Sequence, residues 1–141
     1  MILIAAVDDR GGLTFNRRRQ SQDRILRQQI LSMTAGKRLW MDHYTAGQFE
    51  QPLAPQIITD DGCLARAAEE DYCFIERCPS PLRTDHIRQV ILFRWNRRYP
   101  ADVSFPIRLE SPEWQMIHTE EFPGYSHEKI TKEVWKHEKE I

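Results

Sequence analysis

The sequence predicts an α/β domain with a mixed, mainly parallel sheet, flanking helices and a C-terminal antiparallel hairpin. First, residues 2–7 form a continuous apolar run, as a central strand covered on both faces would. Second, apolar residues recur at helical spacing in residues 23–36, which predicts an amphipathic helix. Third, short strand and helix patterns alternate up to residue 95, and two strands at 114–121 and 128–135 follow.

Each element has its own signal. Residues 13–22 lack a periodic pattern and are interpreted as an irregular, arginine-rich loop, after which Asp23 favours a helix start and Gly36 a helix end. Short apolar runs predict further strands at 37–41, 56–59, 72–75 and 89–95. Short helices are expected at 43–49 and 60–68, and a brief helix or turn at 82–88. Prolines 100, 106 and 112 predict an irregular stretch before the final hairpin.

Composition limits the possible class of protein. The 141 residues, 40% of them hydrophobic and 29% charged, predict one soluble domain spanning 1–141. The opening residues are too few for a signal peptide and no run reaches membrane-span length, so we expect a cytoplasmic protein without a membrane partner. The spacing of Cys63, Cys73 and Cys78 matches no common zinc pattern, and no metal is expected. The oligomeric state stays open.

Basic charge is concentrated in two arginine-rich segments, residues 16–23 and 94–99, which hold six of the fifteen arginines although the net charge is −1. Guanidinium groups bind phosphates and carboxylates, while the interleaved Trp95 and Tyr99 are suited to stacking on bases. The alternatives are a solvated loop and a structural ion-pair network. The candidate ligand-binding residues are Asn16, Arg17, Arg18, Arg19, Gln20, Ser21, Arg94, Asn96, Arg97 and Arg98.

Several short motifs resemble those of the dihydrofolate reductase family. Residues 101–106, Ala-Asp-Val-Ser-Phe-Pro, resemble its Gly-Asp-Thr-x-Phe-Pro turn, and Trp114 and Ser126-His127 stand where the family often has a tryptophan and a Ser-His pair. Residues 4–7 and 34–41 resemble its first strand and the end of its first helix with the second strand. The resemblance covers nearly the whole chain and implies a dihydrofolate reductase-like fold.

The same resemblance implies altered folate and nicotinamide sites. The position of the family's pterin-binding carboxylate falls at Leu26, nearly one turn from Asp23. The phosphate-approaching Gly-Arg-x-Thr is replaced by residues 42–45, Asp-His-Tyr-Thr, and the Gly-Gly turn by Glu76-Arg77. Phe93 stands in place of a threonine that helps to hold the pterin. A divergent member of the family is therefore expected.

Asp23 and His127 are the candidate catalytic residues. His127 is suited to general acid–base cleavage of a phosphodiester, with His118 near it if the hairpin register permits. The alternatives are that Asp23 pairs with an arginine and that His127 bonds within the sheet end. The leading hypothesis is a protein that binds an anionic small molecule or RNA, such as a nucleotide, without a cofactor and with ribonuclease-type hydrolysis as an extension. An NADPH-dependent reductase and a non-catalytic interaction protein are the alternatives.

Overall fold

The fold is built on a twisted seven-stranded sheet. The computed structural model describes residues 1–78 and 82–138. The strands lie in the order β5-β4-β6-β1-β7-β10-β9. Their bounds are β5 Ile57–Thr59, β4 Leu39–Met41, β6 Tyr72–Phe74, β1 Ile2–Val7, β7 Gln89–Arg94, β10 Ile130–His137 and β9 Trp114–Phe122. The first five are parallel and the last two form an antiparallel hairpin, so the predicted mixed sheet is confirmed.

β1 is the central strand that its apolar sequence predicts. It pairs in parallel with β6 on one side and with β7 on the other. Five of its six residues are buried, which the covering of both sheet faces explains. Because parallel strands end together, the segments that follow β1, β6 and β7 meet at one edge of the sheet.

The core lies on both faces of the sheet. On one face Leu26 and Ile30 of α1, Arg24–Met33, pack with Ile4 and Phe93. On the other face Leu3 packs with residues of the segment 107–114. The short helices α2, His43–Ala46, and α3, Cys63–Arg66, connect the strands of the parallel half. Within the described residues, no helix is long and apolar enough to cross a membrane.

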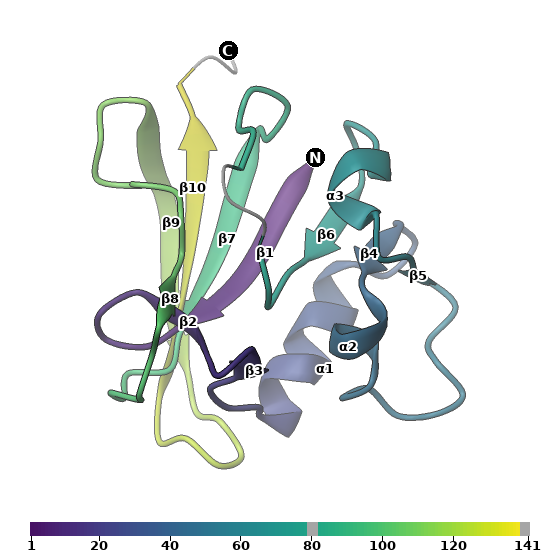
Figure 1. The fold of residues 1–141 in the computed structure, drawn as a ribbon, viewed down its shortest axis with the longest axis horizontal. Coiled ribbons are helices and arrows are strands. Elements are labelled where there is room, and N and C mark those ends of the chain that lie inside the picture. The colour runs from purple at the N-terminus through teal and green to yellow at the C-terminus, as the bar shows by residue number, and fades with distance from the viewer. Residues whose placement is uncertain (79–81, 139–141) are drawn as a thin grey trace.

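A small second sheet corrects the sequence analysis. Residues 13–22 were expected to be irregular, but they form most of a hairpin of β2, Gly12–Phe15, and β3, Arg18–Arg19, which β8, Val103–Ser104, extends. The two turn residues, Asn16 and Arg17, both have positive φ, of 51° and 62°. Such a two-residue turn matches the twist of the strands and normally has the sequence Asn-Gly. Because Arg17 stands in the glycine position, the sequence lacks the usual signature of a hairpin. Figure 1 shows the hairpin at the carboxyl end of β1, beside the first turn of α1.

Candidate functional site

A buried carboxylate after β1 joins the two arginine-rich segments. The Asp8 side chain is 1% exposed, and its Oδ1 accepts the backbone N–H of Gly12 at 2.7 Å. Its Oδ2 accepts from Gln20 Nε2 at 3.1 Å and from the backbone N–H of Tyr99 at 3.2 Å. A Cβ on Gly12 would stand 2.6 Å from the Cβ of Ala101, so glycine allows this close approach. One residue of each segment is thus anchored to the same carboxylate.

Asp23 is a second buried junction. As the N-cap of α1 it accepts the N–H groups of Ile25 at 2.8 Å and Leu26 at 3.3 Å. The turn between β9 and β10 donates two more, from Tyr125 at 3.0 Å and Ser126 at 2.8 Å. Burial opposes the charge of the Asp23 carboxylate, but these hydrogen bonds and that of His127 outweigh it and hold its pKa well below the usual value. Asp23 is therefore ionised at neutral pH.

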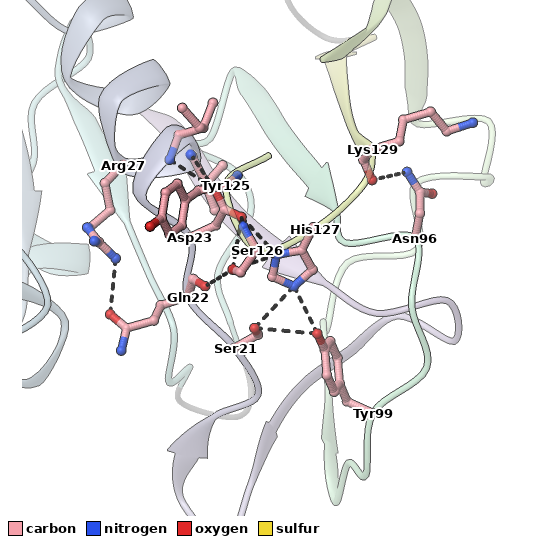
Figure 2. A network of polar contacts seen from close by, with 12 residues as sticks. Ser21, Gln22, Asp23, Arg27, Asn96, Tyr99, Tyr125, Ser126, His127 and Lys129 are labelled. Atoms are coloured by element: carbon pink, nitrogen blue, oxygen red, sulfur yellow. Dashed lines mark hydrogen bonds and ion pairs between the residues drawn. The ribbon is translucent and has the colours of Figure 1, made fainter. Parts of the chain in front are cut away.

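His127 links Asp23 to hydroxyl groups of both segments (Figure 2). Its Nδ1 lies 2.9 Å from Asp23 Oδ2, and its Nε2 lies 2.8 Å from the Tyr99 hydroxyl and 3.2 Å from Ser21 Oγ. Because Asp23 is ionised, Nδ1 is assigned the proton, which leaves Nε2 of the neutral ring to accept from a hydroxyl. The ring is 3% exposed and stacks on Trp95, with centroids 4.4 Å apart. It is a fixed, polar junction inside an aromatic environment.

A pocket of about 410 Å³ opens beside the hairpin. Its lining is Phe15, Asn16, Arg18, Arg19, Gln20, Tyr99 and Pro100. The only charged side chains among these residues are the two guanidinium groups, and no carboxylate in the described part of the chain pairs with Arg18. The pocket therefore combines positive charge, amides and two aromatic rings, which is an arrangement suited to an anionic, planar ligand.

Arg19 is held in place by a buried acid. Its Nε lies 2.9 Å and 3.1 Å from the two oxygens of Glu76, which follows β6. Its guanidinium donates to the Tyr44 carbonyl at 2.9 Å and lies over the Tyr44 ring at 4.3 Å. Burial raises the pKa of Glu76, and the charge of Arg19 counteracts this rise. Arg19 thus connects the hairpin to the sheet, and its guanidinium group is not free to bind an anion.

The other predicted ligand residues are spread around this edge. Arg17 lies at the hairpin turn, and Arg97 and Arg98 are exposed beyond β7, outside the pocket lining. The Asn96 amide donates to Lys129 O at 3.0 Å. Arg94 pairs with Glu133 at 3.0 Å and borders a different hollow on the sheet face opposite α1. The two segments meet through Gln20, Ser21 and Tyr99, and not through all of their arginines.

Asp8 and the Tyr99 hydroxyl are parts of the site that were not predicted from the sequence. Asp8 directly follows a buried parallel strand, a position where polar side chains often serve a site, and that signal was available. His118 does not take part: it lies on β9 opposite Val134 and is exposed, with its nearest acid Glu120. No group of three metal-ligating side chains occurs in the described residues.

The fold is that of dihydrofolate reductase. The chain is similar to dihydrofolate reductase from Enterococcus faecalis complexed with NADP(H) and RAB-propyl, with a TM-score of 0.66 over 97% of this chain and 95% of that chain. At 12% identity the likeness establishes the fold alone. No protein-family model matches the sequence, and the search of curated proteins finds no significant match.

Two carboxylates stand where the family resemblance implies that a cofactor approaches, and both have partners within the chain. The buried carboxylate of Glu76, bonded to Arg19, stands where the family resemblance places a Gly-Gly turn. Asp42 caps α2, accepting the N–H of Thr45 at 2.8 Å, where the family's cofactor phosphates approach. Glu76 is paired with Arg19, and Asp42 lies 3.7 Å from a guanidinium nitrogen of Arg77, so each carboxylate is matched by an arginine of the chain.

Replacing Arg19 and Arg18 by alanine separates a structural arginine from a free one. Arg19→Ala leaves Glu76 buried and unpaired, and we expect the free energy of unfolding to fall by about 3–5 kcal/mol. Arg18→Ala removes no ion pair and is expected to change it by less than about 0.5 kcal/mol. Adding Glu76→Gln to Arg19→Ala should restore part of the loss. Urea denaturation of the four proteins measures this, and equal losses in both single variants would contradict it.

Asp23→Asn should change the acid stability. The folded-state pKa of Asp23 is lowered from 3.8, so its carboxylate stabilises the fold above that pH, and this contribution is lost as the pH falls below it. We expect Asp23→Asn to lower the free energy of unfolding at pH 7 by at least about 2 kcal/mol and to weaken the pH dependence below about pH 4. Urea denaturation at both pH values tests this, with the exposed Asp9→Asn as control.

Proposed function

We propose that the chain binds a phosphorylated ligand, a nucleotide or RNA, at the pocket beside the hairpin. The observation that carries the proposal is the Arg18 guanidinium, which borders the pocket without an ion-pair partner, while no carboxylate stands among the described lining residues. Phosphate oxygens accept bidentate hydrogen bonds from guanidinium, and Arg18 has no competing partner in the part of the chain that is described. Asn16 and Gln20 add amides that orient the ligand.

The surrounding arginines support the same proposal. No ion pair in the described ranges involves Arg17, Arg97 or Arg98, so their charges are available to attract an anion. Arg17 also adopts a left-handed backbone conformation with φ of 62°, which is uncommon for a residue other than Gly or Asn and costs about 1 kcal/mol. A charged side chain at this turn is readily explained by a binding role.

Binding should depend on Arg18 and on salt. A fluorescently labelled short RNA and a nucleoside monophosphate are titrated against the protein at low salt. We expect Arg18→Ala to weaken binding by about tenfold or more and raised salt to weaken it in both proteins. Arg38→Ala is the matched control, because Arg38 is exposed at the opposite, amino-terminal end of β4. Absence of binding at low salt, or an equal loss in the control, would remove the proposal.

Cleavage of the bound phosphodiester, the first step of ribonuclease-type hydrolysis, is a second candidate, favoured by the Asp23–His127 pair. Because both side chains are buried, they can reach a ligand only through a hydroxyl group that contacts His127. The Tyr99 hydroxyl makes this contact, and Tyr99 also lines the pocket. In this reaction the ribose 2′-hydroxyl oxygen attacks phosphorus, its proton passes to the Tyr99 oxygen, and the Tyr99 proton passes to Nε2 of the neutral His127 ring. The bond from phosphorus to the 5′-oxygen breaks, and the leaving oxygen takes the proton that His127 returns through Tyr99.

The hydroxyl of Tyr99 decides between binding and cleavage. If the second candidate holds, Tyr99→Phe lowers the rate of RNA cleavage by about 100-fold or more while the affinity stays within about twofold. Tyr125→Phe is the control, since Tyr125 is 68% exposed and its ring contacts Arg24. Product formation from a short RNA is measured by gel electrophoresis. Cleavage no faster than in buffer, or an equal rate in Tyr99→Phe, would exclude this reaction and leave the binding proposal in place.

A further inference from the structure

We infer that the pocket recognises a nucleobase as well as a phosphate, with Phe15 as the surface on which the base stacks. This inference rests on the proposed function and deepens it, because it distinguishes a nucleobase-bearing ligand from other phosphate esters. The ligand chemistry is a flat aromatic base joined to a phosphate, whether in a mononucleotide or in a single strand of RNA.

Phe15 is exposed in a way that the fold does not require. It is the last residue of β2, where Leu13 and Thr14 are buried, yet its own side chain is 42% exposed. It belongs to neither of the two core clusters in the described residues, and it borders the pocket together with Arg18. An exposed aromatic ring beside unpaired positive charge is the combination that single-stranded nucleic-acid sites use for bases and phosphates.

Tyr99 forms a second aromatic wall that is already fixed. Its hydroxyl lies 2.8 Å from His127 Nε2, and its backbone N–H donates to Asp8. Both partners are buried, so the ring is held before any ligand arrives. A wall that needs no ordering reduces the entropic cost of binding a flat ligand.

Two amides supply the polar edge that a base needs. The Asn16 side chain has no hydrogen-bond partner in the described part of the chain, and its position is set by the backbone bond from its N–H to Asp102 at 3.1 Å. Gln20 donates from Nε2, but its buried Oε1 has no partner among the described atoms. Amides offer both donors and acceptors to base edges, and a volume of about 410 Å³ lies in the range of small-molecule sites.

The test compares four phosphate compounds by isothermal titration at low salt: inorganic phosphate, ribose 5-phosphate, AMP and a short 5′-phosphorylated oligoadenylate. For the wild-type protein we expect AMP to bind at least about fivefold more tightly than ribose 5-phosphate. Phe15→Ala should abolish this difference and leave the affinity for ribose 5-phosphate within about twofold. The matched control is Val103→Ala, since Val103 is a similarly exposed apolar residue on the neighbouring β8 that lies outside the pocket lining.

The outcomes separate the inference from the function on which it rests. Equal affinity for AMP and ribose 5-phosphate would overturn base recognition while the phosphate site survives, and so would a preference for AMP that Phe15→Ala leaves intact. Binding of none of the four compounds would overturn both. A base preference that depends on Phe15 supports the inference. If the oligoadenylate then binds more tightly than AMP, the ligand is an RNA strand, and if the two bind equally, the ligand is a mononucleotide.

Discussion

The site depends on the buried contact between Asp23 and His127. The Asp23 carboxylate accepts backbone N–H groups from the first turn of α1 and from the β9–β10 turn. Its charge also favours the tautomer of His127 that carries the proton on Nδ1. The opposite nitrogen then meets a hydroxyl from each arginine-rich segment, Ser21 and Tyr99. Three stretches of chain that are far apart in sequence are therefore joined by one acid and one imidazole. Glycine at position 124 allows this close packing, because a Cβ there would stand 2.7 Å from Asp23 Oδ2.

The arginines at this edge of the sheet fall into two groups, those with a carboxylate partner and those without one in the described residues. Arg19 and Arg94 each meet a mostly buried carboxylate, so their charges serve the packing of the hairpin and of β7 against β10. Arg17 and Arg18 stand on the turn and on the far strand of the hairpin, where no described carboxylate meets them. Charge that folding has not neutralised is charge that a ligand can use. This division explains how a chain with net charge −1 presents a locally positive pocket.

The sequence predicted the layered architecture because its signals are local. The apolar run of β1, the helical spacing of α1 and the final hairpin each correspond to an observed element, and the motifs resembling dihydrofolate reductase agree with the observed fold. The β2–β3 hairpin was missed because Arg17 occupies a turn position that usually holds glycine. The pairing of Asp23 with His127 and of Arg19 with Glu76 spans 104 and 57 residues, and one sequence carries no register for such contacts. Asp23 and His127 are separate candidates in the sequence, and only the fold brings them together.

The most direct test of this account is hydrogen–deuterium exchange in a His127→Asn variant compared with the wild-type protein. If His127 joins the segments, exchange should rise together in residues 18–23, 97–102 and 124–128, while β1 and β7 keep their protection, because their ladder bonds do not involve the imidazole. An increase confined to residues 124–128 would contradict the account, because the contacts of Asp8 with Gln20 and Tyr99 would then hold the two arginine-rich segments in place without the imidazole.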